Sequence, residues 1–146
     1  MKTLLWLQGL TCSGNTQSLL NAENPYIYEI FSKINLLYHP SLSIDNNLDE
    51  IIDKILNQKI SLNFLIVEGA ITKNKNFCKI GDYSIADLVN KLKDKAEYII
   101  AVGNCAVHGN LPANYRENKD VCGLQFKFEE KKDYYLLILK LSLDIL

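Results

Sequence analysis

Short apolar runs alternate along this chain with stretches whose apolar residues repeat at helical spacing. Nearly continuous apolar runs occupy residues 3–8, 64–67 and 98–102, as is typical of strands covered on both faces. Within residues 48–56, apolar residues fall at offsets of 0, 3, 4, 7 and 8, which places them on one face of a helix. Strands that alternate with helices predict a parallel sheet with right-handed crossovers. The chain is therefore expected to be an α/β protein.

The ends of the predicted helices are indicated by capping residues. Asn24, followed by proline, is predicted to cap one helix, Asn47 a second and Ser84 a third. The remaining predicted elements are a strand at residues 35–39 and helices at residues 16–22, 26–34 and 85–92.

These elements together predict one flavodoxin-like three-layer sandwich over residues 1–130. Residues 124–128 alternate in polarity and are a candidate edge strand. Residues 131–146 show neither a clean period nor turn residues, so they are treated as a tail whose structure the pattern does not define.

Composition excludes several classes of partner. The net charge is −1, from 16 basic and 17 acidic residues, so no basic field exists to attract nucleic acid or an anionic membrane. The longest apolar run, residues 134–139, is too short to span a bilayer, which needs about 20 residues. Met1 and Lys2 lead directly into the first strand without a secretory signal. We expect a cytoplasmic protein with reduced thiols, associated with a membrane only through a complex.

Two turns that each carry a cysteine and glycine follow predicted strands. Cys12 and Gly14 lie in the turn after the first strand, and Gly103 and Cys105 follow the strand at residues 98–102. Ligands of doubly wound sheets bind outside the carboxyl ends of the strands, near the point where strand order reverses. If both turns lie on that edge, the two cysteines form a candidate metal–sulfur site.

Three segments resemble the small subunits of nickel–iron hydrogenases, a family that includes the 20 kDa subunit of NADH:ubiquinone oxidoreductase. The segments read WLQGLTCSGNTQSLL from Trp6, VEGAI from Val67 and AVGNCA from Ala101. Their order and spacing agree with the family over residues 3–125, which is most of the chain.

The resemblance implies a flavodoxin-like domain that pairs with a hydrogenase large subunit and exchanges electrons with a donor or acceptor protein. Cys12 and Cys105 match ligands of a [4Fe–4S] cluster, with Gly14 and Gly103 beside them. Glu68 matches an acid at a strand end, where the resemblance implies a role at the subunit interface in positioning or proton movement. The chain alone is not expected to be catalytic, because the nickel ligands belong to the large subunit.

The chain departs from the family at two of the four ligand positions. Asn15 stands where the loop normally has its second cysteine, and the Gly-Cys-Pro expected after the next core strand is absent. An amide oxygen is a hard, neutral donor and substitutes poorly for a thiolate. The resemblance therefore implies a truncated, frameshifted or degenerate member. Cys78 and Cys122 are either substitute ligands or packing thiols.

Two other functions compete with this interpretation. Residues 11–16 (TCSGNT) also resemble the phosphate loop of flavodoxins, which predicts an FMN-binding electron carrier. The turns after Val67 and Val102 carry no aromatic residue to stack on a flavin ring, which counts against it. The missing ligands favour a third possibility, an interaction module that has kept the fold and lost the cofactor.

Overall fold

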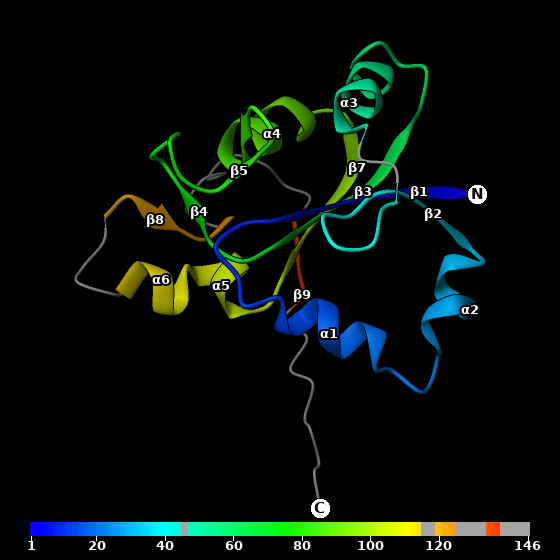
Figure 1. The fold of residues 1–146 in the computed structure, drawn as a ribbon, viewed down its shortest axis with the longest axis horizontal. Coiled ribbons are helices and arrows are strands. Elements are labelled where there is room, and N and C mark those ends of the chain that lie inside the picture. Colours follow the sequence, from blue (N-terminus) through cyan, green and yellow to red (C-terminus); the bar gives the residue numbers. More distant parts are fainter. Residues whose placement is uncertain (45–46, 115–118, 125–133, 138–146) are drawn as a thin grey trace, which may run out of the picture.

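The structure is a computed structural model that describes residues 1–44, 47–114, 119–124 and 134–137 (Figure 1). Its centre is a parallel sheet of five strands in the order β2-β1-β3-β7-β9. The strands are β1 (Lys2–Gln8), β2 (Ile34–Tyr38), β3 (Leu62–Glu68), β7 (Ala96–Val102) and β9 (Tyr134–Leu137). The predicted α/β fold with a parallel sheet is confirmed.

Helices lie on both faces of this sheet. One face carries α1 (Gly14–Leu20) and α2 (Ile27–Phe31), and the other carries α3 (Leu48–Leu56) and α4 (Ile85–Leu92) (Figure 1). Side chains alternate along each strand, so Leu5, Leu7 and Leu65 enter the core with α3 and α4. Trp6 and Ile66 face the side of α1 and α2.

Short elements complete the fold around the sheet. Helices α5 (Asn104–His108) and α6 (Asn110–Asn114) follow β7 directly. Two small antiparallel sheets pair β4 (Ile71–Thr72) with β8 (Val121–Cys122), and β5 (Lys79–Ile80) with β6 (Tyr83–Ser84). No helix among the described residues has the length and apolar character needed to cross a membrane.

The strand register aligns the carboxyl ends of the three central strands. Gln8 of β1 pairs with Glu68 of β3, and Glu68 pairs with Val102 of β7. The turns that follow these strands therefore emerge at one edge of the sheet, which we call the rim. Leu137 pairs with Val102, so β9 ends at the same rim.

Two of the three predicted helix caps are confirmed. The Asn47 side chain accepts the Glu50 N–H, and the Ser84 hydroxyl accepts the Asp87 N–H. The predicted Asn24 cap is wrong, because α2 begins at Ile27 with Tyr26 as its N-cap.

The Tyr26 N–H donates to the Glu29 carboxylate at 2.8 Å, and this bond fixes the start of α2 after the proline. The first helix, predicted from residue 16, begins at Gly14 because its first N–H groups donate to Glu68. Within the predicted tail, residues 134–137 form β9. Residues 125–128 of the candidate edge strand lie outside the described residues.

Candidate functional site

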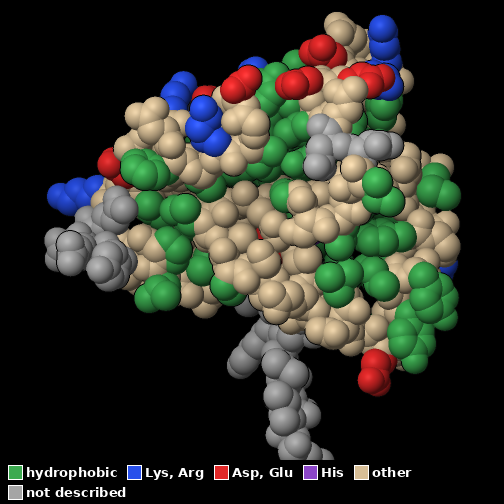
Figure 2. Space-filling model, in the orientation of Figure 1, with side chains coloured by type: hydrophobic (Ala, Val, Ile, Leu, Met, Phe, Trp, Pro, Cys, Tyr) green, Lys and Arg blue, Asp and Glu red, His purple; other side chains and the backbone are tan. Residues whose placement is uncertain are grey.

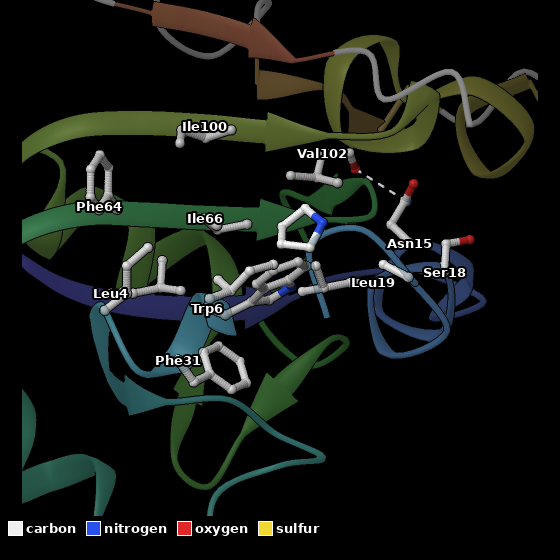
Figure 3. A pocket seen from close by; sticks show the side chains of 14 residues that line it. Leu4, Trp6, Asn15, Ser18, Leu19, Phe31, Phe64, Ile66, Ile100 and Val102 are labelled. Carbon is white, nitrogen blue, oxygen red and sulfur yellow. Dashed lines mark hydrogen bonds between the residues drawn. The ribbon is translucent and has the colours of Figure 1, made fainter. Parts of the chain in front are cut away.

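The two cysteine-bearing turns touch each other at the rim. The Asn15 side chain, from the first turn of α1, lies against Gly103, where an added Cβ would come within 2.4 Å of its Nδ2. This amide also donates to the Val102 carbonyl at 3.5 Å (Figure 3). Gly103 has a φ of +83°, a backbone conformation that favours glycine. The glycine therefore serves both the turn and its contact with the opposite loop.

Cys12 lies near enough to Cys105 to influence its thiol. Cys12 is exposed and Cys105 is partly buried, and both are free thiols. Burial raises the pKa of Cys105, and the nearby Cys12 thiol raises it further. Bonds from the Leu111 N–H and the Asn110 side chain act in the opposite direction. The structure thus brings together the two cysteines that the sequence placed in separate turns.

Gly14 gives the Cys12 sulfur its space. A Cβ added at Gly14 would lie 3.2 Å from the Cys12 Sγ, which is tighter than an ordinary contact. Ser13 before it has a left-handed backbone, with a φ of 60°, and its N–H donates to the Thr11 hydroxyl at 3.0 Å. These features turn the chain sharply between β1 and α1.

Glu68, at the end of β3, is completely buried beneath the Cys12 turn. Its carboxylate accepts bonds from the backbone N–H groups of Asn15 (3.1 Å) and Thr16 (3.3 Å). The side-chain donors are Trp6 Nε1, Gln8 Nε2, Thr11 Oγ1 and Thr16 Oγ1, at 3.3, 3.1, 3.4 and 2.5 Å. Glu68 therefore holds the turn and the start of α1 onto the sheet.

The hydrogen bonds keep Glu68 ionised despite its burial. Burial is the largest single effect and raises the pKa of this carboxyl. The bonds from Thr16, Gln8 and Asn15 together outweigh it, so the pKa lies below its ordinary value. A buried negative charge therefore lies directly behind the turn that carries Cys12.

His39 extends this network to the end of β2, and the sequence did not predict its role. Its ring is buried, with Nδ1 accepting the Ser41 N–H at 3.0 Å and Nε2 lying 3.2 Å from the Thr16 hydroxyl. Since Nδ1 accepts, Nε2 carries the proton and donates to Thr16, which in turn donates to Glu68. Burial lowers the pKa of His39, although the Glu68 charge opposes this, so the ring is neutral.

The signal that could have identified His39 was its position directly after a strand of the same sheet. The sequence analysis instead placed His39 inside the predicted strand at residues 35–39, as its last residue. The observed β2 ends at Tyr38, so the imidazole lies at the rim beside the first turn of α1.

The same network bears on the FMN alternative. A phosphate loop binds its anion through free backbone N–H groups at the start of a helix. Here the N–H groups of Asn15 and Thr16 already donate to the Glu68 carboxylate. A phosphate would have to displace the Glu68 carboxylate, which is bonded to six donor groups. The negative charge of this carboxylate would also repel the phosphate. The geometry therefore does not favour a flavin phosphate at this turn.

An apolar groove of about 410 Å³ lies between the sheet and the α1–α2 segment (Figure 3). Trp6, Phe31 and Phe64 line it together with aliphatic side chains of β1, β3 and β7. Asn15 and Ser18 are the polar residues of its lining, and no charged side chain contributes to it. The groove lies on one face of the sheet, and Asn15 connects it to the rim.

Cys78 and Cys122 do not join Cys12 and Cys105 in a described group of three or more possible metal ligands. Cys78 packs against the hydrophobic core, where burial raises the pKa of its thiol, and Cys122 pairs with Ile71 in the β4–β8 sheet. Across the described part of the chain, no three His, Cys, Asp or Glu side chains are grouped so as to hold a metal ion.

Comparisons with known proteins show which family this chain is similar to. The family described as NADH ubiquinone oxidoreductase, 20 Kd subunit, matches residues 12–138. The small subunit of the periplasmic [NiFeSe] hydrogenase of Desulfomicrobium baculatum is 32% identical over 75% of this chain and 40% of its own. The F420 non-reducing hydrogenase II small subunit of Methanosarcina mazei is 28% identical over 85% of this chain and 38% of its own.

Solved structures show the same fold. The reduced, active Ni-Fe-Se hydrogenase from Desulfomicrobium baculatum superposes with a TM-score of 0.78 at 26% identity, covering 93% of this chain and 55% of that one. The chain spans about two fifths of the length of these two curated relatives. The match over residues 12–138 shows that this chain belongs to the NADH ubiquinone oxidoreductase 20 Kd subunit family, and the relatives that it resembles include hydrogenase small subunits.

Proposed function

We propose that this chain is the flavodoxin-like part of an electron-transfer small subunit of a nickel–iron hydrogenase. In this role it carries an iron–sulfur centre at Cys12 and Cys105 and passes electrons to or from the active site of a large subunit. The observation that carries the proposal is the contact between the two cysteine-bearing turns at one rim. The family membership and the named hydrogenase relatives support it.

The thiols of one copy fit half of a four-thiolate cluster. Cys12 and Cys105 are soft, anionic donors when deprotonated, as iron–sulfur clusters require. Asn15 occupies the position of a third ligand, but its amide is engaged with the Val102 carbonyl and lies against Gly103. The described residues of a single copy therefore do not complete a [4Fe–4S] site.

The residues around the two thiols have defined roles in this proposal. Glu68 fixes the Cys12 turn through its bonds to Asn15 and Thr16, and His39 orients the Thr16 hydroxyl. The Leu111 N–H, bonded to the sulfur of Cys105, favours the thiolate that binds iron. The hydrogenase large subunit and an electron donor or acceptor protein are the proposed partners. The cytoplasm remains the predicted location.

A cofactor-free interaction module is the second candidate, and Asn15 favours it because the side chain is already hydrogen-bonded within the protein. The chain should be purified without oxygen and reconstituted with iron and sulfide, and its absorbance recorded. A broad brown band that Cys12→Ala and Cys105→Ala each abolish supports the iron–sulfur proposal, with Cys78→Ala as the control that keeps the colour. Two resolved yellow bands would indicate flavin, and a colourless protein would leave the interaction module.

A further inference from the structure

The Thr16 hydroxyl has all of its hydrogen-bonding capacity in use. A hydroxyl donates one hydrogen bond and accepts two. This one accepts from Gln8 Nε2 at 3.0 Å and from His39 Nε2 at 3.2 Å, so its own proton points to the Glu68 carboxylate. His39 therefore helps to fix the direction of the bond by which Thr16 holds Glu68.

The His39 ring fills this role only while it is neutral. Its Nδ1 accepts the Ser41 N–H at 3.0 Å. In an imidazolium both ring nitrogens donate, so a proton on Nδ1 would face the Ser41 N–H and break this hydrogen bond. The ring is only 1% exposed, and burying its charge adds a further cost. The ring therefore has to leave its pocket to take up a proton.

Glu68 is the charged group that faces this ring. It attracts an imidazolium and so raises the pKa of His39, but burial lowers that pKa by more. Uncharged side chains face the ring from the other described elements: Trp6 of β1, with ring centroids 5.2 Å apart, Thr16 of α1 and Ser41 of the ring's own loop. On the face drawn in Figure 2, the charged side chains lie mainly over α3 and α4. The ring is therefore neutral at neutral pH.

The loop at residues 39–43 reaches the same hydroxyl by a second route. The Ser41 hydroxyl donates to Gln8 Oε1 at 3.5 Å, and Gln8 Nε2 is the other donor to Thr16. Movement of the ring and its loop would remove one donor from the Thr16 hydroxyl and loosen the other. The hydroxyl would then be free to turn away from Glu68.

We propose that His39 is a positioning residue for the Cys12 turn and that proton uptake by its ring releases this turn. The path runs from the ring through the Thr16 hydroxyl to Glu68, whose carboxylate bonds the backbone of the turn. Every group in the path comes from residues 8–68 of one copy, and none of them is a metal ligand. The inference rests on the proposed function, because it describes how acid regulates that same site.

The closing experiment measures how fast Cys12 of the full, metal-free chain reacts with a dipyridyl disulfide, which labels thiols at acid pH. Peptide mapping separates Cys12 from the other cysteines, and rates are taken from about pH 7.5 to about pH 4.5, where Glu68 stays ionised. Each rate is divided by that of His39→Phe, which keeps an aromatic ring and removes both nitrogens. The quotient cancels the pH dependence of the thiol itself.

We expect the wild type to react about two- to tenfold more slowly than His39→Phe near neutral pH, the factor that one hydrogen bond is typically worth. The two rates should become equal below pH 6.5, once the wild-type ring is protonated. Thr16→Val removes the hydroxyl and keeps the shape of the side chain, so it should react fast at every pH. Thr16→Ser should restore the wild-type profile. Thr16→Val is the reference should His39→Phe fail to fold.

Trp6, the single tryptophan of the chain, reports the ring directly because the two rings are in contact. Its fluorescence should change over the same pH range in the wild type and in Thr16→Val, but not in His39→Phe. A quotient that stays constant with pH, or a Thr16→Val variant as slow as the wild type, would overturn the inference. Neither result involves iron, so the proposed function is decided separately by the reconstitution experiment.

Discussion

Glu68 is a charged side chain with no exposed surface, and its neighbours explain how the fold tolerates it. An ionised carboxylate in the interior is costly unless hydrogen bonds replace its water. Backbone N–H groups of α1 and side chains from β1 and the Cys12 turn provide them. The charge therefore stabilises the turn only as long as all of these donors surround it.

Replacing Glu68 by Gln should destabilise the protein by about 2–3 kcal/mol, because the amide cannot accept bonds at both ends and leaves buried donors unpaired. Chemical unfolding monitored by circular dichroism measures the change. Cys12 should also react faster with a thiol-specific alkylating agent, since its turn loses its anchor. An unchanged midpoint and an unchanged alkylation rate would contradict this role.

The pKa of Glu68 predicts how the free energy of unfolding changes at acidic pH. Its pKa in the folded protein lies below the ordinary 4.5, so the contribution is complete above pH 4.5. As the pH falls below 4.5 toward the folded pKa, the unfolded chain binds the proton first and the contribution is lost. The difference in unfolding free energy between the wild type and Glu68→Gln should therefore shrink below pH 4.5. A difference independent of pH in that range would contradict the assignment.

The pKa of His39 predicts a second pH dependence of the free energy of unfolding, in a higher pH range than that of Glu68. The pKa of His39 is lowered from the ordinary 6.5 in the folded protein. Below pH 6.5, the imidazole therefore binds a proton in the unfolded chain while it stays neutral in the folded chain. Stability should fall by up to about 1.4 kcal/mol per pH unit below 6.5 until the folded pKa is reached. His39→Gln should remove this slope in unfolding experiments. His108→Gln, which changes the other histidine of the chain, should keep it.

At the scale of elements, side-chain periodicity predicted the helices and strands whose formation depends on the burial of their own side chains. The stripe at residues 48–56 became α3 because it matches one buried helix face, and the continuous apolar run at 98–102 became β7 because it matches a strand covered on both faces. The start of α2 was missed because it depends on the Glu29 side chain returning to the backbone. The role of His39 was missed because its partners come from other elements, and no local pattern encodes them.

The Asn47 cap leads to a prediction about the stability of α3. Its side chain accepts the Glu50 N–H at 3.3 Å, and Asn47→Ala should cost about 1 kcal/mol of unfolding free energy. Asn47→Ser, which keeps a capping oxygen, should recover most of that loss. If Asn47→Ala and Asn47→Ser changed the unfolding free energy equally in thermal unfolding, the capping oxygen would contribute nothing to stability.

At the scale of the whole molecule, the sheet order determines which distant turns become neighbours. The sequence predicted that the turns at Cys12 and Cys105 share an edge, because parallel strands end on one side. It did not predict which groups make the contact. That contact is the Asn15 amide against Gly103, at a position that the family resemblance assigned to a missing ligand.

Gly103→Ala should separate the two turns, because the new Cβ would overlap the Asn15 amide and the backbone has a positive φ. We expect a loss of about 1–3 kcal/mol and a lower iron uptake at the rim. Gly81→Ala is the matched control: Gly81 also has a positive φ, but nothing lies within 4 Å of its Cβ position. Unfolding and iron analysis of both variants distinguish backbone strain from loss of the contact.

The Thr16 hydroxyl links groups from three different strands, since it accepts from Gln8 of β1, lies beside His39 after β2 and donates to Glu68 of β3. Those three side chains come from regions far apart in the polypeptide and meet only once the strands are paired. The shape of the cysteine-bearing loop is therefore a property of the finished sheet. A peptide of residues 1–22 would contain the loop's full sequence and Gln8, but it would lack His39 and Glu68, which hold the loop in its folded form.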